Sequence, residues 1–102
     1  MASDISLDRV LHAIADPTRR RILQALRESS REAKSTAVKP GISLCGGDIE
    51  ARIHLSQPTI SHHMAILTKA GLVEARKKGQ WRWYQRNEKA LRQVVKMLRG
   101  KL

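Results

Sequence analysis

Apolar residues recur with helical spacing near both ends of this chain of 102 residues. The i, i+3, i+4, i+7 pattern predicts a first helix from about Leu7 to Ala15 and a last helix from about Glu88 to Arg99. The apolar positions are Leu7, Val10, Leu11 and Ile14 in the first helix and Leu91, Val94, Val95 and Leu98 in the last.

A second helix is predicted to start at Asp16-Pro17, because aspartate is a favoured N-cap and proline is tolerated in the first helical turn. Its apolar positions continue through Ile22 and Leu26, and then the helical rhythm fails. Residues 29–41 are rich in Ser, Lys, Thr and Glu and close with Pro and Gly, so we predict an exposed loop over this stretch.

A very short strand is predicted over residues 42–45, followed by a third helix capped by Asp48. Ser56 is the predicted N-cap of a fourth helix, which has Pro58 in its first turn, where a missing N–H costs nothing. One face of this helix is apolar and ends at Gly71, whereas short polar side chains crowd the N-terminal half of the opposite face.

Two strands are predicted over residues 73–77 and 80–86, around a two-residue turn at Lys78-Gly79. Short helix, turn, long helix and hairpin in this order are typical of a winged helix-turn-helix protein. We therefore predict one mainly α-helical domain over residues 1–102 with a small β-hairpin.

Composition agrees with helix packing, since the chain has no Phe, two Trp and one Tyr, and its core has to be built from Leu, Ile, Val, Met and Ala. The 20 Lys and Arg residues outnumber the 9 Asp and Glu residues, which gives a net charge of +11. Six basic residues against one acidic residue place +5 of this charge on residues 56–86 alone. The expected partner is therefore a polyanion.

The remaining composition excludes several classes of function. A single cysteine, no signal peptide and no long apolar run favour a cytoplasmic protein without a membrane span. No nucleophile–base pair, paired carboxylates or metal-binding constellation is visible, so we expect no enzyme, no cofactor and no metal site. The adjacent His62 and His63 cannot share one helix face and have no ligand partner at i+3 or i+4.

Double-stranded DNA is the polyanion that this arrangement fits, because the fourth helix can enter a major groove while the basic hairpin grips the backbone. We expect Trp81, Trp83 and Tyr84 to pack in the core rather than stack on bases. The candidate DNA-binding residues are Ser56, Gln57, Thr59, Ser61, His62 and His63 on the helix and Arg76, Lys77, Lys78 and Arg82 on the hairpin.

The apolar faces of the first and last helices exceed what a three-helix winged domain needs for its core. They therefore predict a homodimer interface. Its candidate residues are Leu7, Val10, Leu11, Ile14, Leu91, Val94, Val95 and Leu98.

Four stretches of the chain resemble the ArsR family of winged helix-turn-helix repressors. They are residues 11–23, 56–64, 70–73 and 78–84. The resemblance implies a homodimer that joins through its first and last helices, binds a palindromic operator and represses transcription. It also implies base-reading roles for Ser56, Gln57, Thr59, Ser61 and His62, and a wing over residues 76–82.

The metal sites of that family are incomplete in this sequence. Where metal-sensing members carry two nearby cysteines, this chain has Cys45 followed by Gly46 and Gly47, and its last helix has no His and only Glu88. The sequence is therefore more similar to the metal-independent, SdpR-like branch. Two alternatives stay open, namely a redox- or metalloid-responsive repressor that senses through Cys45 and a basic RNA-binding accessory protein.

Overall fold

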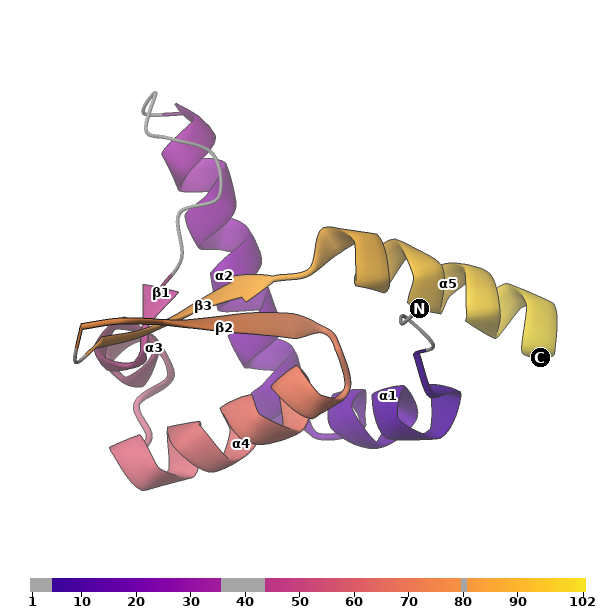
Figure 1. Ribbon diagram of the computed structural model, residues 1–102, viewed down its shortest axis with the longest axis horizontal. Coiled ribbons are helices and arrows are strands. Elements are labelled where there is room, and N and C mark those ends of the chain that lie inside the picture. The colour runs from indigo at the N-terminus through magenta and orange to yellow at the C-terminus, as the bar shows by residue number, and fades with distance from the viewer. Residues whose placement is uncertain (1–4, 36–43, 80) are drawn as a thin grey trace.

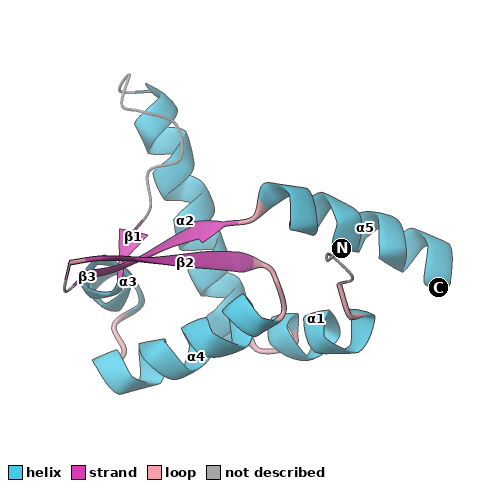
Figure 2. Ribbon diagram, in the orientation of Figure 1, coloured by secondary structure: helices cyan, strands magenta, loops and turns pink. Residues whose placement is uncertain are grey.

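The computed structural model describes residues 5–35, 44–79 and 81–102, with the backbone alone described for residues 29–35, 44–46, 78 and 81. Five helices and three short strands make up this part of the chain (Figures 1 and 2). They are α1 (Leu7–Ile14), α2 (Pro17–Ser35), β1 (Leu44–Cys45), α3 (Gly46–Ile53), α4 (Gln57–Lys69), β2 (Val73–Lys78), β3 (Trp81–Arg86) and α5 (Glu88–Lys101). The predicted fold class, mainly helical with a small β-hairpin, is confirmed.

The three strands form an antiparallel sheet in the order β1-β3-β2. The hairpin tip and the N-terminal end of α4 lie at one end of the molecule, whereas α1 and α5 lie at the other (Figure 1). The molecule therefore separates its predicted DNA-contacting elements from its predicted dimer elements.

The core is built from one apolar face of each helix and from the strands. Tyr84 from β3 is buried in it, as predicted, and Trp83 is half-buried, whereas the Trp81 side chain lies outside the described part. The largest fully buried side chains are Ile22, Ile49, Ile60, Met64, Leu67, Leu72, Val10 and Val73. Removing this apolar surface from water is the main source of stability for the arrangement.

The α4–β2 connection ends α4 with a pair of backbone hydrogen bonds. The Leu72 amide donates to the Leu67 carbonyl at 3.1 Å, and the Gly71 amide donates to the Thr68 carbonyl at 3.0 Å. Gly71 has φ +83°, in the left-handed region that favours glycine at this position after a helix. The prediction that Gly71 ends the helix is confirmed.

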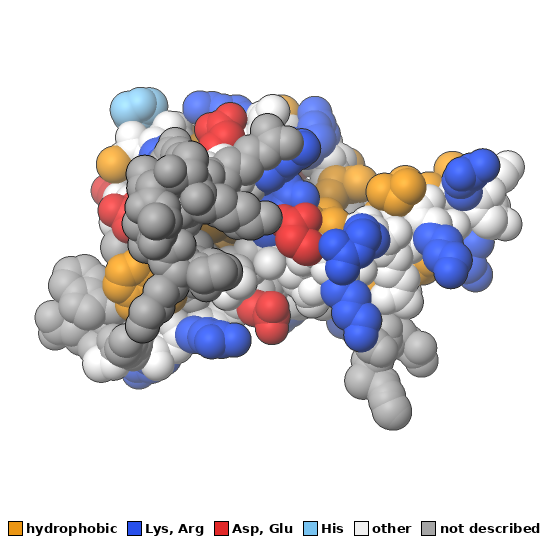
Figure 3. Space-filling view, turned by 90° about the horizontal axis from the view of Figure 1, so that it is seen from above, with side chains coloured by type: hydrophobic (Ala, Val, Ile, Leu, Met, Phe, Trp, Pro, Cys, Tyr) orange, Lys and Arg blue, Asp and Glu red, His pale blue; other side chains and the backbone are white. Residues whose placement is uncertain are grey.

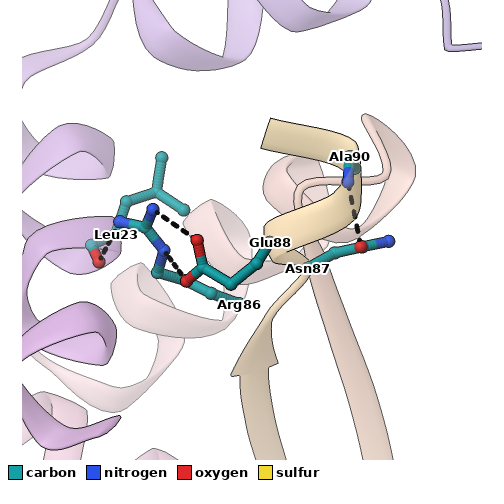
Figure 4. Close-up of polar contacts among 5 residues, drawn as sticks. All are labelled: Leu23, Arg86, Asn87, Glu88 and Ala90. Atoms are coloured by element: carbon teal, nitrogen blue, oxygen red, sulfur yellow. Dashed lines mark hydrogen bonds and ion pairs between the residues drawn. The ribbon is translucent and has the colours of Figure 1, made fainter. Parts of the chain in front are cut away.

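A second connection fixes α5 to the rest of the molecule. The Arg86 guanidinium donates to Glu88 at 2.8 and 3.2 Å and to the Leu23 carbonyl of α2 at 3.3 Å (Figure 4). The Asn87 side chain accepts from the Ala90 amide at 3.1 Å and so caps α5. Arg86 therefore has a structural task at the β3–α5 junction.

The predictions for the end of α2 and the start of α3 were wrong in detail. The loop predicted over residues 29–41 is helical as far as Ser35, and residues 36–43 lie outside the described part. Residues 28–34 include Glu, Arg, Ala and Lys, all good helix formers. The end of α2 extends beyond the sheet (Figure 1), and the helix continues there although no apolar pattern repeats over residues 29–35 of the sequence. Asp48 lies in the first turn of α3, which begins at Gly46, and is not its N-cap.

Candidate nucleic-acid interface

Helix α4 presents an apolar face to the core and a polar face to solvent. Ile60, Met64 and Leu67 are buried. Ser56 occupies the predicted N-cap position with an extended backbone, φ −65° and ψ 156°, although its side chain makes no capping hydrogen bond. The predicted reading residues Ser56, Gln57, Thr59, Ser61 and His62 are all exposed, and His63 is half-buried.

The exposed polar side chains near the start of α4 bond to one another. The Ser56 and Thr59 hydroxyls lie 2.9 Å apart, and the Ser61 hydroxyl donates to the Gln57 side-chain carbonyl at 3.1 Å. Each of these groups can replace its present hydrogen bond with one to a base edge, and no buried polar atom is left unpaired when it does so. This cluster of hydroxyl and amide groups therefore matches the mixed donor and acceptor pattern of a major groove.

The wing is the hairpin of β2 and β3, with Gly79 in its turn at φ +64°. Lys78 pairs with Trp81 and belongs to β2, so the turn predicted at Lys78-Gly79 was placed one residue too early. Lys77 lies directly opposite Arg82, and Arg76 lies directly opposite Trp83. Arg76, Lys77 and Arg82 are exposed, and none of the three forms an ion pair within the described part of the chain. Two like charges facing each other across a strand pair destabilise it, and a phosphate between them would remove that cost.

The Lys78 side chain is not among the described ones, so its predicted DNA contact stays a prediction.

Arg19 is a functional candidate that the sequence reasoning missed. It is only 7% exposed and is the one charged residue among those described as buried. Its Nε donates to the Ala13 carbonyl at 2.7 Å, and one terminal nitrogen donates to the His12 carbonyl at 3.0 Å. The other terminal nitrogen lies 3.2 Å from Nδ1 of His63 on α4.

The position of Arg19 in the second helix could have identified it. Arg19 lies three residues before the buried Ile22 and four before the buried Leu23, so it falls on the apolar face of α2. The preceding turn supports this position. Asp16 accepts from the Arg19 amide at 3.0 Å, and this hydrogen bond is the main cause that lowers the pKa of Asp16.

The predicted dimer residues divide into two groups. Val10 and Val94 lie in the core of the chain itself, at the centre of the apolar stripes of α1 and α5, and are not available to a partner. Leu11 and Val95 are 40% and 63% exposed. The half-buried members are Leu7, Ile14, Leu91 and Leu98. Hydrophobic side chains are visible among Lys and Arg side chains toward the α5 end of the molecule (Figure 3).

Among the described residues, no group of three or more His, Cys, Asp or Glu side chains is placed to hold a metal ion. The backbone of Cys45 pairs with Trp83 in the sheet, but its side chain lies outside the described part. Sensing through Cys45 therefore stays an untested alternative. Within the same described ranges, no helix has the length and apolar character needed to cross a membrane.

Helix α4 has an exposed polar face, follows a short helix and a turn, and lies beside an exposed basic hairpin. This arrangement defines a winged helix-turn-helix protein. A family model described as "Bacterial regulatory protein, arsR family" matches residues 41–75. The uncharacterized HTH-type transcriptional regulator MJ1325 of Methanocaldococcus jannaschii is 36% identical over 87% of this chain and 86% of its own. The transcriptional repressor SdpR of Bacillus subtilis is 34% identical over 87% and 84%. The chain belongs to the arsR family.

A solved structure supports the same assignment. It is described as a possible transcriptional regulator for arsenical resistance, and it aligns with a TM-score of 0.69 and 32% identity over 93% of this chain and 84% of that one. The chain is therefore a transcriptional regulator of this family and not an enzyme, in agreement with the absence of catalytic motifs in the sequence.

Proposed function

We propose that the protein is a cytoplasmic homodimeric repressor that binds an inverted-repeat DNA operator. In each subunit α4 reads base edges in the major groove, and the wing contacts the adjacent backbone. The observation that carries this proposal is the exposed polar cluster Ser56, Gln57, Thr59 and Ser61 at one end of the molecule, together with exposed cations of the hairpin at the same end. These cations are Arg76, Lys77 and Arg82, which form no ion pair with any described residue. The two half-site centres would lie about one helical turn apart, ~34 Å.

Base reading and backbone binding can be tested separately. Gln57→Ala or Ser61→Ala is expected to weaken binding to the operator by ~1–3 kcal/mol and to change binding to random duplex little. Lys77→Ala is expected to weaken both and to lower the slope of log affinity against log salt by about 1. Lys101, an exposed lysine at the far end of α5, provides the control, and Lys101→Ala should leave both affinities unchanged.

Duplexes selected by the protein from a random pool supply the operator for these measurements. If Gln57→Ala lowered the affinity for operator and for random DNA equally, the base-reading residues would have to lie elsewhere in the protein. Tighter binding to structured RNA than to any selected duplex would favour the RNA-binding alternative instead.

The dimer has its own test in α5. Val95→Glu introduces a charge at the exposed apolar position and is expected to dissociate the dimer in sedimentation experiments. Gln93→Glu adds the same charge at an exposed polar position of the same helix and should leave the dimer intact. A protein that sediments as a single chain before any substitution would contradict the proposed assembly.

Metalloid response is the second candidate, since the structure with 32% identity is described by its relation to arsenical resistance. Release of DNA by arsenite or an oxidant, abolished by Cys45→Ser, would support it. Unchanged DNA binding in both treatments favours the repressor without this sensor.

A further inference from the structure

Arg19 is bonded to both helices whose relative position decides how a dimer meets DNA. Helix α1 carries Leu11, part of the proposed partner-facing surface, and the last carbonyls of α1 accept from the Arg19 side chain. Helix α4 carries the proposed reading residues, and the same guanidinium contacts His63 on it. A planar guanidinium with fixed donor directions holds its acceptors in a defined geometry.

We propose that Arg19 is a positioning residue for operator recognition, which holds α4 through His63 at a fixed offset from α1. This inference rests on the proposed function above. If two copies meet through α1 and α5, the offset between α1 and α4 sets the distance and angle between the two reading helices. Arg19 would then determine which half-site spacing the dimer accepts, without touching DNA.

The contact also fixes the chemical form of His63. A guanidinium can only donate, so Nδ1 has to be the acceptor and the ring proton lies on Nε2 of a neutral imidazole. Burial is the main cause that lowers the pKa of His63, the neighbouring Arg19 and His62 lower it further, and Asp16 opposes them. A protonated ring would present a donor to the guanidinium, and the contact would be lost.

The first experiment compares operator with a scrambled duplex of the same composition. Arg19→Gln and His63→Ala are each expected to lower the ratio of the two affinities about tenfold, and the double variant should lower it no further than the stronger single variant. Arg20→Gln is the matched control, because Arg20 also donates to a carbonyl at the end of α1, that of Ile14 at 2.7 Å, and forms no hydrogen bond or ion pair with α4 among the described residues. It removes the same charge and should leave the ratio unchanged.

The second experiment uses readouts that a purely stabilising role would not move. One base pair inserted between the half-sites shifts them by ~3.4 Å. This insertion should weaken the unaltered protein and Arg20→Gln strongly and Arg19→Gln much less. In the unaltered protein, protonation of His63 should lower the operator preference in mildly acidic solution. His63→Asn places an acceptor at the Nδ1 position without a titrating group. It should therefore keep the operator preference of the unaltered protein and should not lose it in acid.

Several outcomes would overturn the inference while the proposed function stands. One is an equal effect of Arg19→Gln and Arg20→Gln on the ratio of operator to scrambled-duplex affinity. Another is a half-site spacing preference that Arg19→Gln leaves unchanged. The third is a loss of operator preference in His63→Asn as large as that in His63→Ala. Failure of the unaltered protein to prefer any duplex would instead refute the proposed function. If Arg19→Gln does not fold, the spacing preference of His63→Ala provides the comparison against Arg20→Gln, because loss of a direct DNA contact by His63 would not relax that preference.

Discussion

Replacing Gly71 by alanine is expected to destabilise the protein through the backbone alone. Gly71 links α4 to the wing, and its φ of +83° lies in the left-handed region. A Cβ added there would have no neighbour within 4 Å, so steric crowding with the rest of the molecule does not contribute. The two hydrogen bonds that end α4 require this conformation, because they are made by the Gly71 and Leu72 amides.

The magnitude follows from two opposing effects. A residue with a side chain pays about 1–2 kcal/mol to adopt the left-handed conformation. Alanine also restricts the unfolded chain, which returns about 0.4–1 kcal/mol. Gly71→Ala should therefore lower the free energy of unfolding by about 1 kcal/mol.

Gly100 offers a matched control for this substitution. It lies in the last turns of α5, and a Cβ added there would also meet nothing within 4 Å. Because its backbone is helical, Gly100→Ala should raise the free energy of unfolding by up to about 1 kcal/mol. Urea unfolding followed by circular dichroism, at one fixed protein concentration, measures both changes.

Shifts of the same sign in both variants would show that the backbone conformation is not the cause. A Gly71→Ala change smaller than ~0.5 kcal/mol, the range of an ordinary surface substitution, would also refute the reasoning. At temperatures where both variants are folded, operator affinity should stay unchanged, since neither substitution touches a proposed DNA contact.

Three further predictions concern single residues. His54 has φ +65° at the end of α3, so His54→Gly should be about 1 kcal/mol more stable than His54→Ala in urea unfolding. Asp16 and His63 both have a lowered pKa in the folded protein, so each contributes stability that is complete above its unfolded pKa and is lost as the pH falls. Stability measured against pH should decline first below ~6.5 and again below ~4, with Asp16→Asn removing only the second decline. Arg86 is 17% exposed and bonded to Glu88, so Arg86→Gln should cost about 1 kcal/mol of stability, whereas Arg82→Gln should cost DNA affinity and no stability.

The elements that local patterns specify could be predicted from the sequence. The apolar spacing of α1, α4 and α5, the proline in the first turn of α4 and the glycine after it all determine structure through neighbours a few residues away. The end of α2 could not be predicted, because residues 29–35 carry no repeating apolar pattern although the helix continues through them. Helix propensity was the only evidence left in this stretch of sequence, and propensity is a weak guide by itself.

The candidate site divides in the same way. Exposure of the predicted reading residues on α4 followed from helical spacing, whereas the register of the wing was predicted wrongly because its turn was placed at Lys78-Gly79. The contact between Arg19 and His63 joins residues 44 positions apart in the sequence, and no local pattern encodes it. Three consecutive arginines read as a solvated charge run, although the helical phase of the first one places it on the buried face.

Burial of Arg19 also has an energetic consequence for the protein as a regulator. A buried guanidinium is stable only while its acceptors remain in place, since an unpaired buried charge costs several kcal/mol. Movement of α4 relative to α1 would separate Arg19 from His63 or from the α1 carbonyls, so the two helices are expected to move as one body. An effector that releases DNA would then have to break the contact between Arg19 and His63 or act at the dimer surface. Protonation of His63 is the smallest chemical change that breaks the contact with Arg19.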